Sequence, residues 1–241
     1  MPSLDKYSRA LDYTYALGLF PTLEALIMRP EHVRRVLLSG SIAPGQGLER
    51  ILSLCTRHSI RVEEADKALA RIAGKENCYA AAVVSKYSPP LGENARHLLL
   101  YQPQDRGNLG TMLRSALGFS FVDIGIISPA ADVFDPHVIR ASMGAAFSLH
   151  ISEFETYAAY RSAFPGHTLY PFMLDGAVEL GTAVLGIVKP YTLIMGNEGS
   201  GLPAWFQNEG VPVRIPHSDA IDSLNLSVAA SIGMYTFKQN E

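Results

Sequence analysis

Cysteine is scarce in this chain, and the scarcity excludes several classes of protein. Cys55 and Cys78 are the only two in 241 residues, and they do not form a C-x-x-C pair. A disulfide-rich secreted scaffold or a cysteine-ligated zinc site needs more thiols at closer spacing. We therefore expect both side chains to act as small buried hydrophobes in a reducing, cytoplasmic protein.

Long apolar runs are also missing. No segment of about 18 consecutive apolar residues occurs, so the sequence predicts no membrane-spanning helix. The first residues include acidic side chains early and no apolar core, so we do not expect a signal peptide. With 48% hydrophobic and 18% charged residues, the composition is typical of a folded globular protein without a membrane partner.

The chain lacks an excess of positive charge. Its formal net charge is −3, whereas proteins that bind nucleic acids usually carry a basic surface. Residues 1–90 nevertheless hold 12 Lys and Arg against 9 Asp and Glu, while residues 91–241 hold 8 against 14. This split fits an RNA-contact domain beside an acidic domain, and it also fits ordinary solvated faces. The seven His residues do not cluster at ligand spacing, so no metal site is expected.

Alternating helix and strand patterns continue along the whole chain and predict two α/β domains. The Pro-rich segment 88–96 is the best linker, which divides the chain into domains 1–90 and 91–241. In the second domain, apolar strands separated by helices predict a parallel sheet with helices on both faces. The strands are expected at residues 97–102, 123–128, 148–154, 167–174, 191–196 and 211–216.

The segment GNLGTMLR (107–114) lies between an expected strand and an expected helix. Gly107 and Gly110 allow the backbone to approach a ligand, and the start of a helix offers free N–H groups to an anion. Arg114 lies about one turn after Gly110, so its side chain can reach back toward the same edge of the sheet. Taken alone, the segment also fits a structural connection with a surface arginine.

The segment GNEGSG (196–201) follows an uninterrupted apolar strand. Its glycine spacing is G-x-x-G-x-G, whereas a dinucleotide-binding loop has G-x-G-x-x-G and opens a long helix. A nucleotide-dependent oxidoreductase is therefore disfavoured. A tight loop around a cofactor such as S-adenosylmethionine fits better, and a purely structural glycine turn is the alternative.

The segment Ser223–Asn225 opens the last expected helix. Serine and asparagine are common N-caps, and the apolar residues that follow are typical of core packing. An asparagine side chain both donates and accepts hydrogen bonds, so Asn225 could also bridge a cofactor and a loop.

Together, these segments resemble the motifs of the SpoU/TrmH family of RNA ribose 2′-O-methyltransferases. The resemblance extends from His97 to Phe237 and includes four motifs in the family's order. It implies a parallel sheet with a deep trefoil knot, a homodimer, S-adenosylmethionine as cofactor and no metal. The matching residues are Asn108, Gly110 and Arg114; Ala141, Ser142, Gly144 and Ala145; Gly196, Asn197, Glu198, Gly199 and Gly201; and Ser223, Leu224 and Asn225.

The resemblance also implies roles for individual residues. Backbone groups of Gly196, Ile215 and Leu224 would hold the cofactor. The full expected cofactor set is Leu174, Met195, Gly196, Asn197, Gly199, Ile215, Ser223, Leu224 and Asn225. The expected catalytic set is Asn108, Arg114, Glu198, Ser223 and Asn225.

In this family, the arginine that corresponds to Arg114 is often proposed as the catalytic base. A guanidinium group does not lose its proton in a protein, because its pKa lies above about 12. We therefore expect Arg114 to clamp an RNA phosphate and orient the ribose hydroxyl, while the phosphate or a water accepts the proton. Asn108 would position the ribose or Arg114, and Glu198 would brace the knot loop or Arg114.

Residues 1–90 resemble the small RNA substrate-binding domain of many family members. The likeness lies in the segments Gly18–Leu26 and Lys75–Val84, although Lys75-Glu76-Asn77 stands where some members have His-Gln-Gly. The family also often has Asp-Pro shortly before its first motif, where this chain has Asp105-Arg106. Ribosomal RNA is the expected substrate. Transfer RNA, or structured RNA bound by a non-catalytic assembly factor, is the alternative.

Overall fold

The computed structural model describes residues 4–74 and 77–241 and divides the chain into two compact units. The first unit comprises Met1–Tyr87 and Asp132–Ser148, and the second comprises Ser88–Ala131 and Leu149–Glu241. We expected residues 91–241 to form one domain, but Asp132–Ser148 packs with the first unit. The expectation for Lys75 and Glu76 lies outside the described residues.

A four-stranded sheet in the order β1-β4-β2-β3 forms the centre of the first unit. β4 is antiparallel to β1 and β2, while β3 is parallel to β2. The sequence pattern did not predict β1. In the structure its Tyr15 is fully buried. The strands are β1 (Tyr13–Leu17), β2 (Val33–Leu38), β3 (Val62–Glu64) and β4 (Ala80–Ser85).

Helices cover both faces of this sheet. Buried residues of α1 (Leu19–Met28) and α2 (Gln46–Arg57) share one core cluster, and those of α3 (Asp66–Ala73) belong to another. A single turn, η1 (Pro30–His32), precedes β2.

The segment 132–148 joins this unit because its apolar residues complete the unit's core. It contains α5 (Pro136–Ala141), which contacts β1, and η2 (Ala145–Ser148), which contacts α1. Ile139 and Phe147 are buried in the core cluster that also contains residues of α1 and α2. Burial of two large apolar side chains favours this placement over the expected one.

The second unit contains a five-stranded, fully parallel sheet in the order β7-β6-β5-β10-β8, which confirms the predicted fold class. The expected strand at 211–216 is reduced to β11 (Val213–Arg214), which pairs with β9 (Val178–Glu179) in a separate small sheet. Pro212 and Pro216 restrict the length of this strand, because proline has no N–H to donate to a neighbouring strand. The main strands are β5 (His97–Tyr101), β6 (Asp123–Ile127), β7 (His150–Phe154), β8 (Thr168–Pro171) and β10 (Tyr191–Met195).

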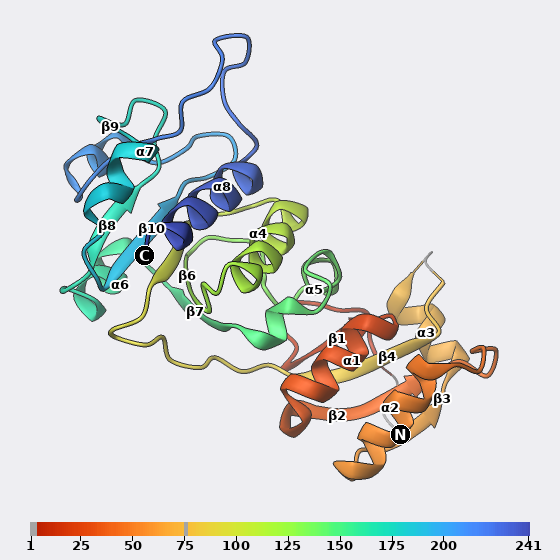
Figure 1. The fold of residues 1–241 in the computed structure, drawn as a ribbon. Coiled ribbons are helices and arrows are strands. Elements are labelled where there is room, and N and C mark those ends of the chain that lie inside the picture. The colour runs from red at the N-terminus through yellow and green to blue at the C-terminus, as the bar shows by residue number, and fades with distance from the viewer. Residues whose placement is uncertain (1–3, 75–76) are drawn as a thin grey trace. The chain divides into compact units, whose positions relative to one another are not determined.

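Helices cover this sheet on both faces, as predicted (Figure 1). Helices α4 (Arg106–Gly118) and α8 (Leu226–Gln239) lie side by side on one face. Helix α6 (Tyr157–Ala163) packs its buried Tyr160 against the other face. Short elements α7 (Leu180–Ala183), η3 (Val184–Gly186) and η4 (Ala204–Asn208) complete the unit. The trefoil knot stays a prediction.

The expected linker 88–96 has no regular secondary structure, but its residues 89–93 are held firmly against the second unit. Leu91 is buried in that unit's core. The Gly92 N–H donates to Asp123 at 2.9 Å, and its carbonyl oxygen lies 2.8 Å from His97 Nε2. The segment is therefore part of the second unit rather than a flexible tether.

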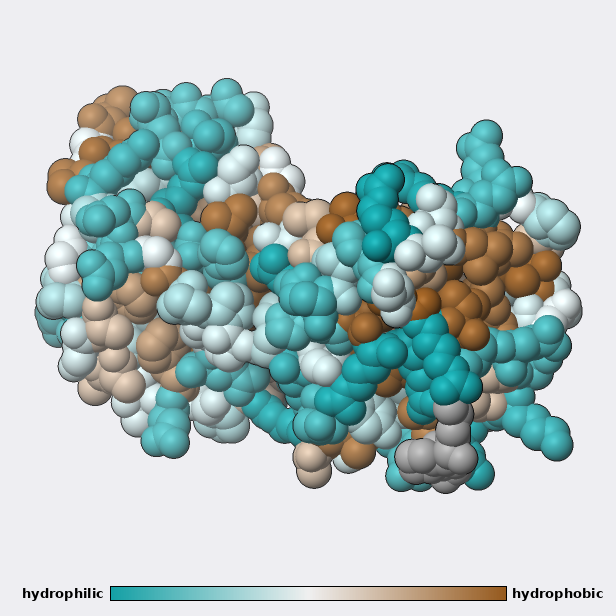
Figure 2. Space-filling model, turned by 90° about the horizontal axis from the view of Figure 1, so that it is seen from below, coloured by the Kyte–Doolittle hydropathy of each residue, from teal (hydrophilic) through white to brown (hydrophobic). Residues whose placement is uncertain are grey.

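Among residues 4–74 and 77–241, no helix is long and apolar enough to cross a membrane. On the face shown in Figure 2, hydrophobic areas are interrupted by hydrophilic ones. Exposed apolar side chains include Phe20 on α1 and Trp205 in η4.

Candidate functional site

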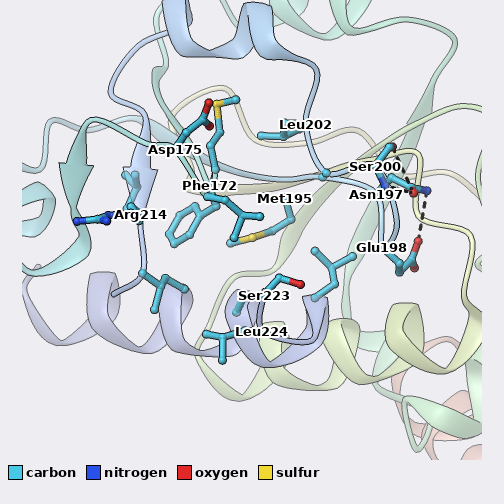
Figure 3. Close-up of a pocket in the computed structure, with 18 of the residues that line it drawn as sticks. Phe172, Asp175, Met195, Asn197, Glu198, Ser200, Leu202, Arg214, Ser223 and Leu224 are labelled. Carbon is cyan, nitrogen blue, oxygen red and sulfur yellow. Dashed lines mark hydrogen bonds between the residues drawn. The ribbon is translucent and has the colours of Figure 1, made fainter. Parts of the chain in front are cut away.

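Three segments far apart in sequence line one cavity of about 400 Å³ in the second unit (Figure 3). Two of them follow β8 and β10 at the carboxyl edge of the parallel sheet. The third runs from β11 to the start of α8. This edge is where open α/β sheets bind ligands. The lining residues are Phe172–Asp175, Met195–Leu202, Val213–Ile215, His217, Ser223, Leu224, Leu226 and Ala229.

The loop after β10 folds back tightly on itself. Asn197 and Gly201 exchange backbone hydrogen bonds at 3.0 and 3.1 Å. The side-chain oxygen of Asn197 accepts from the N–H groups of Gly199 and Ser200 at 2.9 and 3.2 Å. A Cβ on Gly196 would lie 2.4 Å from the carbonyl carbon of Gly201. Only glycine therefore permits this close approach.

The same loop is tied to the segment that precedes α4. Asn197 Nδ2 donates to the Gln102 carbonyl at 2.8 Å. The Glu198 carboxylate accepts from the backbone N–H groups of Gln104 and Asp105, each at 3.0 Å. These hydrogen bonds tie Glu198 to the segment that leads into α4, and the role expected for Glu198 stays a prediction.

The start of α4 is in turn linked to the start of α8. Asn225 Nδ2 donates to Asn108 Oδ1 at 3.1 Å. Asn225 Oδ1 also caps α8 by accepting from Ser227 N at 2.9 Å. Asn225 is thus an N-cap and a bridge between two motifs at once.

Arg114 lies on the exposed side of α4 and does not line the cavity. Its guanidinium has no hydrogen bond or ion pair to any residue in the described part of the chain, Glu198 included. The next residue, Ser115, accepts a hydrogen bond from Ser231 at 2.8 Å, which links α4 to α8. Arg114 is therefore available to a ligand outside the cavity.

The structure brings most of the expected site residues together. The cavity is lined by Leu174, Met195, Gly196, Asn197, Glu198, Gly199, Ile215, Ser223 and Leu224. Asn108, Arg114 and Asn225 lie outside the lining, although Asn108 and Asn225 touch one another. The roles assigned to all these residues stay predictions.

Several residues of the site carried no recognisable sequence signal. Phe172 and Asp175 line the cavity from the segment after β8, and Arg214 does so from β11. Arg214 pairs with Glu179 at 2.9 Å, and Asp175 accepts a hydrogen bond from Gln207. Sequence motifs do not identify these residues, because the path of the chain after β8 and at β11 brings them to the cavity.

In the part of the chain that the structure describes, no group of three or more His, Cys, Asp or Glu is placed to hold a metal.

Comparison with known proteins matches residues 95–235 to the model of the SpoU rRNA Methylase family. A 23S rRNA uridine 2′-O-methyltransferase of Streptomyces viridochromogenes is 31% identical over 160 residues, which cover 61% of this chain and 53% of the relative. The chain thus spans about half the length of this curated relative.

Solved structures extend the likeness to nearly the whole chain. An rRNA methyltransferase from Sinorhizobium meliloti, solved with bound AdoMet, has a TM-score of 0.78 and 25% identity, covering 95% of this chain and 87% of that one. A structure described as concerning 2′-OH methylation of C/U34 on tRNA has a TM-score of 0.56 and 26% identity, covering 62% and 97%. With more than half of its residues matched by the family model, the chain belongs to the SpoU rRNA methylase family.

Proposed function

We propose that this protein transfers the methyl group of S-adenosylmethionine to a ribose 2′-hydroxyl of RNA, and that ribosomal RNA is its substrate. One observation carries the proposal. The cavity formed by Gly196–Gly201, Ile215 and Ser223–Leu224 lies beside the hydrogen-bonded pair Asn108 and Asn225. This arrangement supports the proposal, because the motif expected to hold the cofactor lies next to the motif expected to reach RNA.

The cavity suits this cofactor chemically. Phe172, Met195 and Leu224 offer apolar surface to the adenine ring and to the methylene groups of the methionine chain. Asp175, Glu198 and Arg214 place two carboxylates and one guanidinium in the wall, so charged groups of both signs are available to the amino-acid end of S-adenosylmethionine. When bound, S-adenosylmethionine supplies a methyl group already activated by its sulfonium, so the transfer itself requires no metal.

The protein's contribution would be alignment of the ribose hydroxyl and control of its proton. Arg114 clamps an RNA phosphate through the two-pronged hydrogen bonding of its guanidinium and orients the hydroxyl. Asn108 and Asn225 hold the start of α4 next to the cofactor loops, and Ser223 lines the cavity beside them. The proton passes to the phosphate or to a water, because the guanidinium remains protonated.

We further propose that residues 1–90 serve as the RNA substrate-binding domain, and that two copies of the chain associate as a homodimer. The reaction takes place in the cytoplasm, in keeping with the free thiols of Cys55 and Cys78.

Transfer RNA is the second candidate substrate. The likeness to the structure concerned with tRNA methylation favours it, because that chain is matched along 97% of its length.

Methyl transfer from tritiated S-adenosylmethionine to total RNA, separated into ribosomal and transfer fractions, tests the proposal. We expect label in ribosomal RNA, recovered as an alkali-resistant 2′-O-methylated dinucleotide and lost with Arg114→Ala. Label in transfer RNA alone would assign the other substrate. Absence of label together with absence of S-adenosylmethionine binding would favour a non-catalytic RNA-binding assembly factor.

A further inference from the structure

Asp105 occupies an unusual position between the cofactor loop and the first turn of α4. Its backbone N–H donates to Glu198 Oε1 at 3.0 Å. Its side-chain oxygen accepts from the N–H of Asn108 at 2.7 Å and caps α4. One residue therefore joins the wall of the cavity to the helix that carries Asn108 and Arg114.

The contacts around Asp105 hold α4 from two sides. Before the helix, Glu198 holds Gln104 and Asp105. In its first turn, Asn108 accepts from Asn225, which follows the cavity-lining Leu224. Each connection begins in or next to a segment that lines the cavity, so the loops around the cofactor set the location of this end of α4.

We propose that Asp105 is a positioning residue for methyl transfer: its carboxylate fixes the first turn of α4 so that Asn108 and Arg114 face the RNA in register with the cofactor. The inference rests on the proposed function. Asp105 does not line the cavity, so it acts on the RNA side of the reaction and not on the affinity for the cofactor.

The chain offers a matched control for a cap that only stabilises a helix. Thr156 caps α6 by accepting from Ala159 N at 3.1 Å. Helix α6 packs on the face of the sheet opposite α4. Thr156→Ala therefore removes a helix cap from the same unit without touching α4 or the loops around the cavity.

The experiment compares Asp105→Ala, Asp105→Asn and Thr156→Ala in the full chain, well below their melting temperatures. We expect Asp105→Ala to lower kcat about tenfold and to raise KM for RNA, because a displaced Arg114 loses alignment. Its Kd for S-adenosylmethionine should stay within about twofold of wild type. Asp105→Asn should restore the rate, since asparagine caps helices as well as aspartate does. Thr156→Ala should lower the melting temperature and leave kcat and KM unchanged.

Two results would overturn the proposal. One is an Asp105→Ala variant that resembles Thr156→Ala, with lower stability and unchanged kinetics. The other is a loss of S-adenosylmethionine affinity in parallel with the loss of rate.

Failure of the proposed function is recognised separately, by a wild-type protein that methylates no RNA. In that case hydrogen exchange decides the inference. S-adenosylhomocysteine should protect the amides at the start of α4 in wild type and in Thr156→Ala, but not in Asp105→Ala. Equal protection in all three, or in none, would contradict the role of Asp105.

Discussion

Replacement of Gly196 by alanine is the sharpest test of the loop that lines the cavity. The added Cβ would lie 2.4 Å from the carbonyl carbon of Gly201, 2.5 Å from the backbone nitrogen of Leu202 and 2.7 Å from the Gly201 oxygen. All three are backbone atoms, so no side-chain rotation can relieve the contacts. Ordinary contacts begin at 3.4 Å, and the loop must therefore move by roughly 1 Å to relieve the shortest contact.

The displacement has consequences for both stability and binding. Overpacking of this kind costs about 1–3 kcal/mol of unfolding free energy. It also separates Asn197 from Gly201, whose two backbone hydrogen bonds close the loop. We expect the Kd for S-adenosylmethionine to rise at least tenfold, which corresponds to about 1.4 kcal/mol of binding free energy.

Titration calorimetry with S-adenosylmethionine and thermal unfolding measure the two effects. Gly166→Ala is the control in the same unit, because its Cβ would have no atom within 4 Å and Gly166 does not line the cavity. This variant should bind and melt nearly as wild type does. A Gly196→Ala protein with wild-type Kd and melting temperature would refute the claim that close backbone approach shapes the site.

Three further predictions concern other parts of the second unit. Arg114→Lys should lose most of the methyl-transfer rate, because lysine lacks the two-pronged fork; a near-wild-type rate in a single-turnover assay would contradict the clamp. Asn225→Ala should lower unfolding free energy by about 1 kcal/mol through the lost cap and weaken S-adenosylmethionine binding, while unchanged denaturant midpoints would count against its bridging position. Burial lowers the pKa of His97 from 6.5 to about 4. Between pH 6.5 and pH 4, His97 is therefore protonated in the unfolded chain but still neutral in the folded protein. Stability should accordingly be complete above about pH 6.5 and fall by up to about 1.4 kcal/mol per pH unit toward pH 4. A melting temperature that is flat from pH 7.5 to 5 would show that His97 is not held neutral.

The sequence was sufficient for the local elements and for the chemistry of the motifs. Apolar runs such as 191–195 and the cap at Asn225 depend on neighbours within a few residues, so their strand and helix states are visible in the chain itself. The family resemblance was visible in the same way, because each of its motifs is a short run of residues, and the four motifs occur in the family's order along the chain.

Three features did not follow from local sequence. The segment 132–148 follows a strand of the second unit, yet it packs in the first because Ile139 and Phe147 complete that unit's core. The strand expected at 211–216 is reduced to two residues in a separate sheet. Residues 89–93, expected to belong to a linker, are bonded to the second unit.

By itself, the sequence determined which residue types stand at the ends of strands and helices, and therefore the family and the class of chemistry. Only the tertiary structure decided which of those ends meet. The contact between Glu198 and Gln104 joins residues 94 positions apart, and that between Asn108 and Asn225 joins residues 117 positions apart. Such pairs form because the strand order places the carboxyl ends of β5 and β10 side by side, and side-chain packing across the whole sheet sets that order.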